Sequence, residues 1–573
     1  MIKENLKTCL MLGLMGIGAT QMSQALSPAD IQTDISNSTL VTFYIAGGSA
    51  QANAVVVAAN NLLQSGTIDI YTDTVVSGNC LNSNNFRFIT GKWNTTTSDG
   101  KITAGTPVLI EYHFAKGSYP NGILAVATAN PILTYSTTTS PADQLTTPGF
   151  QAPSELAPST GGPPTGTGVA CQAGAAYPSP TYSFTTTSPQ QITPIFGLSD
   201  VELSMFTFPF NYGAASDYPP LTQSLGGNVT TNVTGTAVYV NVFGIAVSNA
   251  VFGGSSLGPS GCVKTNFSRQ EITGILTGTI DDWGQLYCDN GSEMAAGGIT
   301  LLDRSLGSGT KAAENSYFLN YPAGIATGTQ LTPYSIATGY ASSSTNVCGG
   351  NQTTGTSTGL YDISEASSQA IVNALNAQPG SGEPAMAAGA TTTSGGNCRL
   401  IGVLGAEFPP SLNGPGGSGV GSYSYAAIDG VALDANINGA GGSGNNLTYA
   451  NEINGKYEFQ VTNSFNTRNK SVKGSYGSLN GVAATYFGDG TANSSFTQAM
   501  LSQMQSASFP GGVTSVKYPS GAPGTLIDPS VNFISPGTAC VTLVTRYQET
   551  PAPLQPFNNA TNAGTSFSCS EPH

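Results

Sequence analysis

The stretch from residue 40 to residue 63 constrains the fold more than any other part of the chain. Residues 40–46, Leu-Val-Thr-Phe-Tyr-Ile-Ala, predict a β-strand that is broken by Gly47 and Gly48. Ser49 can cap a helix, and residues 50–63, which are rich in Ala, Val and Asn, predict one. A strand, a glycine turn and a helix form the first half of an α/β unit.

The alternation of strand and helix continues through most of the chain, and it favours an α/β fold over an all-β sandwich. Two segments interrupt it: 135–195 is rich in Thr, Ser, Pro and Gly, and 411–447 in Gly, Ser and Asn, so both predict loops or insertions. The other expected elements are strands at 106–114, 237–248, 299–302 and 457–463, and helices at 268–276, 311–319, 365–376 and 495–505.

The size and charge of the chain limit its partners. With 573 residues it is long enough for a large core or two lobes. Only 8% of the residues are charged, so the surface must be built largely from Gly, Ser, Thr and Asn, as is common in proteins that work outside the cytoplasm. The net charge of -14 excludes a basic nucleic-acid surface and disfavours anionic lipid. An anion can still bind, because its binding depends on the local electrostatic field at the site and not on the net charge of the chain.

The N-terminus has the features of a secretory signal peptide. Lys3 and Lys7 precede an apolar run at 9–19, and Ser23 and Ala25 supply the small residues that a signal peptidase reads. The run is too short for a membrane span, and no later segment has eighteen consecutive apolar residues. We therefore expect cleavage near Ala25, a periplasmic or secreted location and no stable membrane insertion.

The cysteines predict disulfides. Cys9 lies at the start of the apolar run and not at the cleavage site, so no lipid anchor is expected. An even number then remains in an exported chain, and pairing between sequence neighbours is the expected connectivity. A zinc site is the weaker alternative, since there is no CxxC pair and the only histidines are His113 and His573. The candidates are Cys80, Cys171, Cys262, Cys288, Cys348, Cys398, Cys540 and Cys569.

The segment 304–310, Arg-Ser-Leu-Gly-Ser-Gly-Thr, is the best candidate for a binding site. It follows an expected strand and precedes an expected helix, whose free N–H groups attract anions. Gly309 allows close approach to the backbone, Ser308 and Thr310 add hydroxyl donors, and Arg304 can donate two hydrogen bonds to an oxyanion. The alternative is an ordinary strand-to-helix turn. A P-loop is excluded, because the Gly-Lys-Ser/Thr ending is missing.

A second motif upstream makes the segment recognisable. Residues 272–283, Ile-Thr-Gly-Ile-Leu-Thr-Gly-Thr-Ile-Asp-Asp-Trp, resemble the Ile-Phe-x-Gly-x-Ile-x-x-Trp signature of the periplasmic phosphate-binding proteins. In that family the signature precedes a strand and an Arg-x-x-Gly-Ser-Gly-Thr loop, as it does here. The resemblance implies a two-lobed type II periplasmic-binding-protein fold, with inorganic phosphate held in the cleft between hinge-linked lobes.

Three other loops are similar to loops of that family. They are Ala-Gly-Gly-Ser-Ala at 46–50, where the family usually has Thr in place of the last Ala, Gly-Ser at 117–118, and Gly-Leu-Ser-Asp at 197–200. The resemblance therefore assigns phosphate binding to Ser49, Ala50, Ser118, Ser199, Asp200, Arg304, Ser308, Gly309 and Thr310.

Asp200 has a specific chemical meaning in this assignment. A carboxylate repels a fully deprotonated anion, but it accepts a hydrogen bond from an anion that carries a proton. Phosphate is protonated near neutral pH and sulfate is not, so Asp200 would reject sulfate. The alternative is that Asp200 caps a helix or turn.

The resemblance also implies domain bounds and a partner. Lobe one would comprise 28–245 and 456–573, lobe two would comprise 246–455, and the partner would be an ABC transporter permease. One alternative is a secreted or cell-surface attachment protein that keeps the fold. The other is a secreted phosphatase, but no Ser-His-Asp or paired-carboxylate grouping supports an enzyme.

No cofactor is expected. Residues 434–445 resemble a calcium loop only in part, so an Asn/Gly turn is favoured and no metal is predicted.

Overall fold

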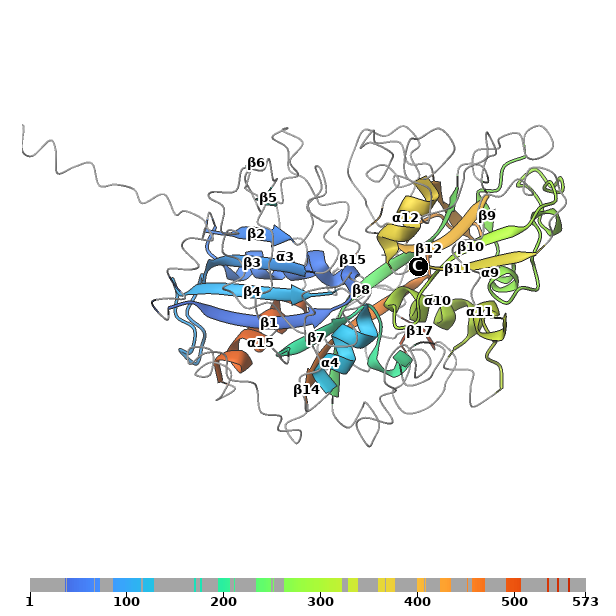
Figure 1. Cartoon of the computed structure of the whole chain (residues 1–573). Helices are drawn as coiled ribbons and strands as arrows, with labels where there is room; N and C mark the ends of the chain where they lie inside the picture. The colour runs from blue at the N-terminus through green and yellow to red at the C-terminus, as the bar shows by residue number, and fades with distance from the viewer. Residues whose placement is uncertain are drawn as a thin grey trace, which may run out of the picture.

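The computed structural model places a mixed sheet along the length of the molecule, with helices packed on it (Figure 1). Of its thirteen strands, ten form a continuous path of hydrogen-bonded neighbours. The structure describes residues 39–65, 67–72, 86–114, 117–127, 194–206, 233–248, 262–321, 328–338, 359–365, 367–376, 399–406, 423–433, 456–468 and 491–505, with several shorter stretches. The expected α/β class is confirmed as a mixed α/β fold.

The first strand group contains β1, the strand predicted at residues 40–46. β1 is buried throughout and lies between two parallel neighbours, β4 and β7. β3 pairs antiparallel with β4, and β2 pairs antiparallel with β3. The bounds are β1 Val41–Gly47, β2 Asp69–Thr72, β3 Phe86–Lys92, β4 Pro107–His113 and β7 Phe196–Ser199.

A single strand of 16 residues, β8 (Val233–Ser248), connects this group to the rest of the sheet. Its pairing partner changes between Val242 and Phe243. Up to Val242 it pairs with β14 (Gln460–Arg468), and from Phe243 onward it pairs with β12 (Leu400–Gly405). β14 in turn pairs with β7 of the first group. The sheet is therefore continuous across this point.

The second strand group lies beyond β8. β10 (Ile299–Arg304) is parallel to both β11 (Leu360–Glu365) and β12. β13 (Tyr423–Ile428) pairs antiparallel with the end of β8 and parallel with the short β9 (Asn266–Phe267). β10 ends at Arg304, the first residue of the loop predicted to bind an anion, and that loop leads into the helix α10 (Gly309–Leu319).

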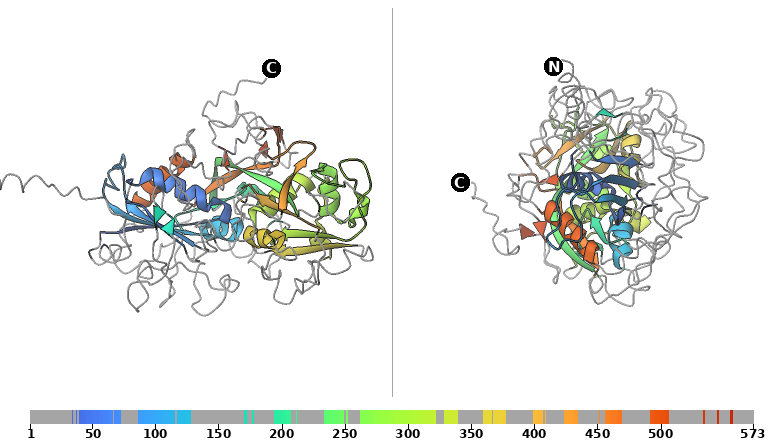
Figure 2. Two further views of the ribbon diagram at one scale, coloured as in Figure 1. Left: turned by 90° about the horizontal axis from the view of Figure 1, so that it is seen from above. Right: turned by 90° about the vertical axis from the view of Figure 1, so that its left-hand side faces the viewer.

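Helices cover each group and complete two separate hydrophobic clusters. α3 (Ala52–Leu62) and α15 (Thr491–Met504) lie side by side on the first group (Figure 2), where Phe43 and Phe496 stack with ring centroids 3.9 Å apart. On the second group, the buried side chains of three further helices pack against β8, β10 and β12. These helices are α9 (Arg269–Leu276), α10 (Gly309–Leu319) and α12 (Ser368–Asn376).

Several expectations are corrected. The helix predicted from 365 begins later, at Ser368, because Glu365 is still paired with Arg304 at the end of β11. The loop predicted at 411–447 contains β13, which exists because β8 supplies its hydrogen-bond partners. The strand predicted at 457–463 is shifted to β14. The signal segment, the calcium-like loop and nearly all of 135–195 lie outside the described residues.

One predicted disulfide is confirmed. Cys262 and Cys288 are bonded, both are buried, and their Cα atoms are 5.3 Å apart. Of the other candidate cysteines, only Cys171 falls in a described strand, β5 (Ala170–Cys171), and its side chain is outside the described set. The remaining pairs therefore stay predictions. Within the described residues, no helix has the length and apolar character to cross a membrane.

The disulfide should contribute measurably to stability. Replacing both partners, Cys262→Ala with Cys288→Ala, removes a link across 26 residues of chain. We expect the free energy of unfolding in urea to fall by about 2–4 kcal/mol, chiefly because the unfolded chain regains freedom. Unchanged unfolding of the double variant, compared with wild type in the absence of reductant, would contradict this.

Candidate functional site

Loops from both strand groups meet at one place. β1, β4 and β7 are parallel, so the turns that follow them lie at the same edge of the sheet. The backbone N–H of Gly48 donates to the carbonyl of Leu198 (3.0 Å), which joins the first and third of these turns. The N–H of Tyr119, after β4, donates to the carbonyl of Gly307 (3.0 Å), which belongs to the loop after β10. Four loops predicted from sequence therefore converge.

Two glycines at this junction pack against the same two side chains. A Cβ atom on Gly48 would overlap the carboxylate of Asp200 and lie 2.5 Å from Ser118 Oγ. A Cβ atom on Gly309, from the other strand group, would lie 2.6 Å from Asp200 Oδ2 and 2.7 Å from Ser118 Oγ. Neither position tolerates a side chain without movement of the loops. Gly307 adds a backbone φ of 89°, which favours glycine.

Asp200 is at the centre of the junction and is buried, with 3% of its surface exposed. Its Oδ1 accepts a hydrogen bond from Gln51 Nε2 (2.8 Å), and its backbone N–H donates to Ser118 Oγ (3.0 Å). Burial raises the pKa of Asp200, because it removes water from the charged form; hydrogen bonds from Gln51 and Ser118 and the charge of Arg304 oppose that rise. The carboxyl group thus holds a proton more readily than an exposed aspartate.

Arg304 supplies positive charge to the junction. It ends β10, is 5% exposed, and its Nη1 donates to Ser368 Oγ (2.5 Å) at the start of α12. Glu365 of β11 lies opposite Arg304 in the register of the two strands. Burial raises the pKa of Glu365, and the charge of Arg304 partly offsets this rise. Arg304 therefore acts on carboxyl groups of both strand groups, Asp200 in one and Glu365 in the other.

The N-terminus of α10 faces the same junction. Ser308 is its N-cap residue but makes no side-chain cap, and its buried Oγ has no hydrogen-bond partner among the described residues. Its Cα would be 3.4 Å from a Cβ atom on Gly117, so it lies against the Ser118 loop. An acceptor placed here would meet this hydroxyl donor and the positive end of an 11-residue helix.

The predicted residues do not all have equal roles. Ser118, Asp200 and Gly309 are in direct contact, with Ser308 beside them. Thr310 is buried in the first turn of α10. Apart from Arg304, described above, three residues remain. Ser199 Oγ accepts from the Val201 N–H (3.3 Å) and so serves its own turn, Ala50 can offer only backbone, and Ser49 is half-buried in the turn η1 (Ser49–Gln51).

Sequence reasoning missed a polar network behind Asp200. Gln51 Nε2 also donates to Asn463 Oδ1 (2.9 Å), Tyr239 OH donates to Gln51 Oε1, and Asn463 Nδ2 donates to the Tyr239 carbonyl (3.2 Å). Tyr239 belongs to β8 and Asn463 to β14, the two strands that run through the junction. In the sequence, Gln51 stands at the start of an Ala/Val-rich helix, which is a weak indication of a site residue. No local pattern points to Tyr239 or Asn463.

A buried charge cluster lies between the first turns of α10 and the strands β10 and β11. Lys311 Nζ contacts Asp303 and lies 2.8 Å from Glu314 Oε1, and each of the three side chains is at most 1% exposed. Asp362 of β11, also buried, interacts with the same charges. One ammonium group thus faces three carboxyl groups. Within the described part of the chain, no group of three or more His, Cys, Asp or Glu is arranged to hold a metal ion.

Burial, followed by the charge of Asp303, raises the pKa of Glu314 from 4.5 to about 7, against the attraction of Lys311. The pKa values of Asp303 and Asp362 are also raised, with burial as the largest cause. A raised pKa means that the folded protein binds the proton more tightly than the unfolded chain. The resulting stability is fully present below about pH 4.5 and is lost as the pH rises to about 7.

We therefore expect the free energy of unfolding, measured in urea, to fall between pH 4.5 and pH 7. Glu314→Gln should reduce the slope against pH by up to about 1.4 kcal/mol per pH unit, the value for one proton. Glu271→Gln, in the adjacent helix α9, serves as a control carboxyl group paired with Lys264. Equal slopes for wild type and Glu314→Gln would show that Glu314 does not titrate in this range.

No protein-family model and no curated protein matches the chain. Among solved structures, it is similar to a Clostridium perfringens protein described as a phosphate ABC transporter substrate-binding protein with bound phosphate. The identity is 9% and the TM-score 0.29, over 78% of this chain and 92% of that one. It is also similar to an ABC-type phosphate transport receptor from Vibrio cholerae, at 12% identity and a TM-score of 0.22, over 47% of this chain and 71% of that one. These values are too low to carry a functional conclusion, which must come from the side chains.

Proposed function

We propose that this protein is an exported solute-binding protein that binds inorganic phosphate, or a similar protonated oxyanion, where the two strand groups meet. The observation that supports this most directly is the contact of Asp200 and Ser118 with Gly309 at the N-terminus of α10. Arg304 adds a positive charge that acts on Asp200. A helix N-terminus, an arginine and a carboxylate that can accept a hydrogen bond are together suited to an anion that carries a proton.

Each group has a separate task in this proposal. The N–H groups of α10 and the Ser308 hydroxyl donate hydrogen bonds to the oxygens of the anion. Arg304 balances the charge, as a guanidinium group does for phosphate. Asp200 accepts the hydrogen bond of the protonated oxygen, and Gln51 fixes the direction of its carboxylate through the 2.8 Å bond to Oδ1. An anion without a proton would meet only repulsion from Asp200.

The strand groups would correspond to two lobes, with bounds at 28–245 plus 456–573 and at 246–455. In this view β8 and β14 form the connection, and the anion bridges donors of both lobes. Ser118 and Asp200 come from lobe one, and Arg304, Ser308 and Gly309 from lobe two. Because the full set of donors exists only when the lobes are together, the ligand would stabilise the closed state. A membrane permease of the ABC type is the partner that would receive the anion.

Ser308→Ala tests the site with little risk to the fold, because the hydroxyl is buried and makes no hydrogen bond to the described residues that the change would break. We expect calorimetric titration with phosphate to show an affinity about 10- to 100-fold weaker than wild type, the loss expected for a hydrogen bond to a charged group. Thr462→Val, which removes another buried hydroxyl with no hydrogen-bond partner among the described residues, is the matched control in β14. If Ser308→Ala binds phosphate as wild type does, the α10 N-terminus is not the site. If folded wild-type protein shows no phosphate binding, the proposed function is wrong.

Asp200→Asn tests selectivity. The amide keeps an oxygen that can accept from Gln51 and removes the negative charge, so sulfate should no longer be repelled. Wild type should bind phosphate and not sulfate, whereas the variant should bind sulfate with an affinity raised at least about tenfold, corresponding to about 1.4 kcal/mol. A variant that still binds phosphate and rejects sulfate would place the selectivity in another residue.

A further inference from the structure

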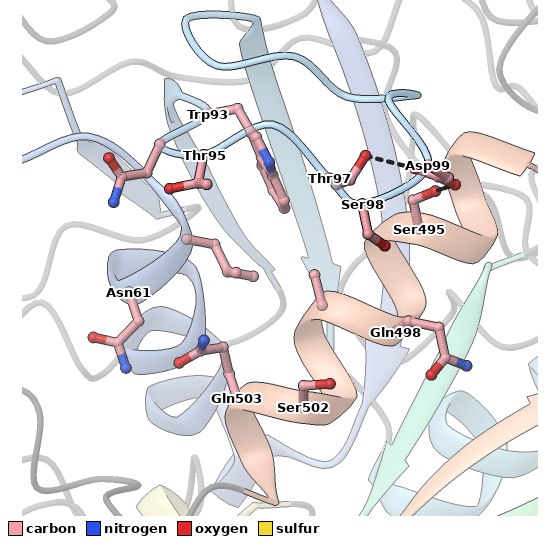
Figure 3. Close-up of a pocket in the computed structure, with 13 residues that line it drawn as sticks. Asn61, Trp93, Thr95, Thr97, Ser98, Asp99, Ser495, Gln498, Ser502 and Gln503 are labelled. Carbon is pink, nitrogen blue, oxygen red and sulfur yellow. Dashed lines mark hydrogen bonds between the residues drawn. The ribbon is translucent and has the colours of Figure 1, made fainter.

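A cavity lies on the first strand group, away from the loops of the proposed anion site. It is bounded by the C-terminal end of α3, by the loop between β3 and β4, and by one face of α15 (Figure 3). Its volume is about 430 Å³, within the range of small-molecule sites. The lining residues are Asn61, Leu62, Trp93, Asn94, Thr95, Thr97, Ser98, Asp99, Ser495, Gln498, Ala499, Ser502 and Gln503.

The lining consists mainly of amide and hydroxyl side chains, which both donate and accept hydrogen bonds. Asn61 belongs to α3, Thr95 and Ser98 to the loop, and Ser502 and Gln503 to α15, so amides and hydroxyls come from three sides of the cavity (Figure 3). Among the described residues that line it, none is a lysine, arginine or histidine. A ligand for this cavity must therefore be rich in groups that donate and accept at once, and it gains nothing from negative charge.

Asp99 is the one charged residue among the described residues of the lining. Its carboxylate accepts from Thr97 Oγ1 (2.6 Å) and from the Lys101 N–H (3.2 Å), and Ser495 Oγ also donates to it. The bond from Ser495 is the largest cause that lowers its pKa, to about 2, so the group is ionised at physiological pH. Asp99 therefore disfavours anions, joins the loop to α15, and presents a fixed acceptor to hydroxyl groups.

An apolar element accompanies the polar groups. Trp93, Leu62 and Ala499 belong to the lining, and the Trp93 ring lies 6.3 Å from the ring of Phe496 in the core below. Trp93 is 2% exposed, so its ring belongs to the core beneath the cavity, and the apolar surface open to a ligand comes from the half-buried Leu62 and Ala499. A ligand with apolar C–H surface beside its hydroxyl groups satisfies both kinds of lining.

The cavity is separate from the anion site. α3 begins at Ala52, next to Gln51 of the junction, and Leu62 at its other end lines the cavity. Eleven residues of helix span about 16 Å, at a rise of about 1.5 Å per residue. None of the residues assigned to the anion site lines the cavity. A ligand here would therefore bind independently of the phosphate contacts.

We infer that this cavity is a binding site for a neutral saccharide. Vicinal sugar hydroxyls match amide and carboxylate side chains, and the C–H face of a sugar ring matches the half-buried apolar side chains of Leu62 and Ala499. Because the described lining holds a carboxylate and no cationic side chain, a sugar phosphate or sugar acid is excluded as the preferred ligand. The charge-poor surface of the chain does not compete with a neutral ligand, because only 8% of all residues are charged.

The test uses the full mature chain and a panel of neutral trisaccharides: maltotriose, cellotriose, mannotriose, laminaritriose and N,N′,N″-triacetylchitotriose. Binding is followed by saturation-transfer NMR and by calorimetric titration. At least one trisaccharide should bind saturably. Asn94→Ala with Gln498→Ala, two exposed lining residues, should weaken that binding at least about tenfold, as expected for the loss of two hydrogen bonds.

Gln270→Ala, an exposed glutamine on α9, is the matched control and should bind as wild type does. Phosphate titration of the double variant should match wild type, so loss of saccharide binding and loss of phosphate binding are separate results. The inference is overturned if no trisaccharide binds saturably, or if the double variant binds with wild-type affinity. Binding of maltotriose 6-phosphate in preference to maltotriose would also overturn it, because that preference requires a cationic group, and the described lining offers none.

Discussion

The hydrogen-bond ladder of β8 holds the whole structure together. This one strand pairs with β14 up to Val242 and with β12 from Phe243 onward, so both hydrophobic clusters depend on the same backbone. The polar network behind Asp200 is anchored there as well, since Tyr239 of β8 donates to Gln51 and Asn463 of β14 accepts from it. The loops of the junction are therefore attached to the strands that connect the two strand groups, and any relative movement of these groups must be accommodated by β8 and β14.

The parts of the site that could be predicted are those encoded by contiguous residues. The turn after the first strand, the Gly-Leu-Ser-Asp turn and the Gly-Ser-Gly-Thr helix start each combine a backbone requirement with a polar side chain within a few positions. Ser118, Asp200 and Gly309 are in contact in the structure. Ser199 was assigned by the same motif, but its hydroxyl accepts from the Val201 N–H of its own turn. A motif thus identifies a loop better than it identifies the direction of each side chain.

Other parts could not be predicted because they depend on strand register. Asn463 is brought to Gln51 by pairing across 412 positions of sequence, and no local pattern contains that information. β13 forms within a segment rich in Gly and Ser because β8 offers it an edge with which to pair. Lys311 and Glu314 were expected only as helix residues, yet both are buried. A charged helix residue is normally exposed, so its burial follows from partners on β10 and β11 that are distant in sequence.

The location of Lys311 has a consequence for the proposed ligand. Its helix, α10, begins at the junction of the loops, and its first turns bring Lys311 and Glu314 to two further carboxyl groups, Asp303 of β10 and Asp362 of β11. An anion bound at the start of α10 adds negative charge near carboxyl groups whose pKa values burial already raises. Thermodynamic linkage then requires that binding draws protons onto the cluster, and that protons in turn strengthen binding. Binding of the proposed anion would then be coupled to the uptake of protons, with its heat dependent on the ionisation enthalpy of the buffer.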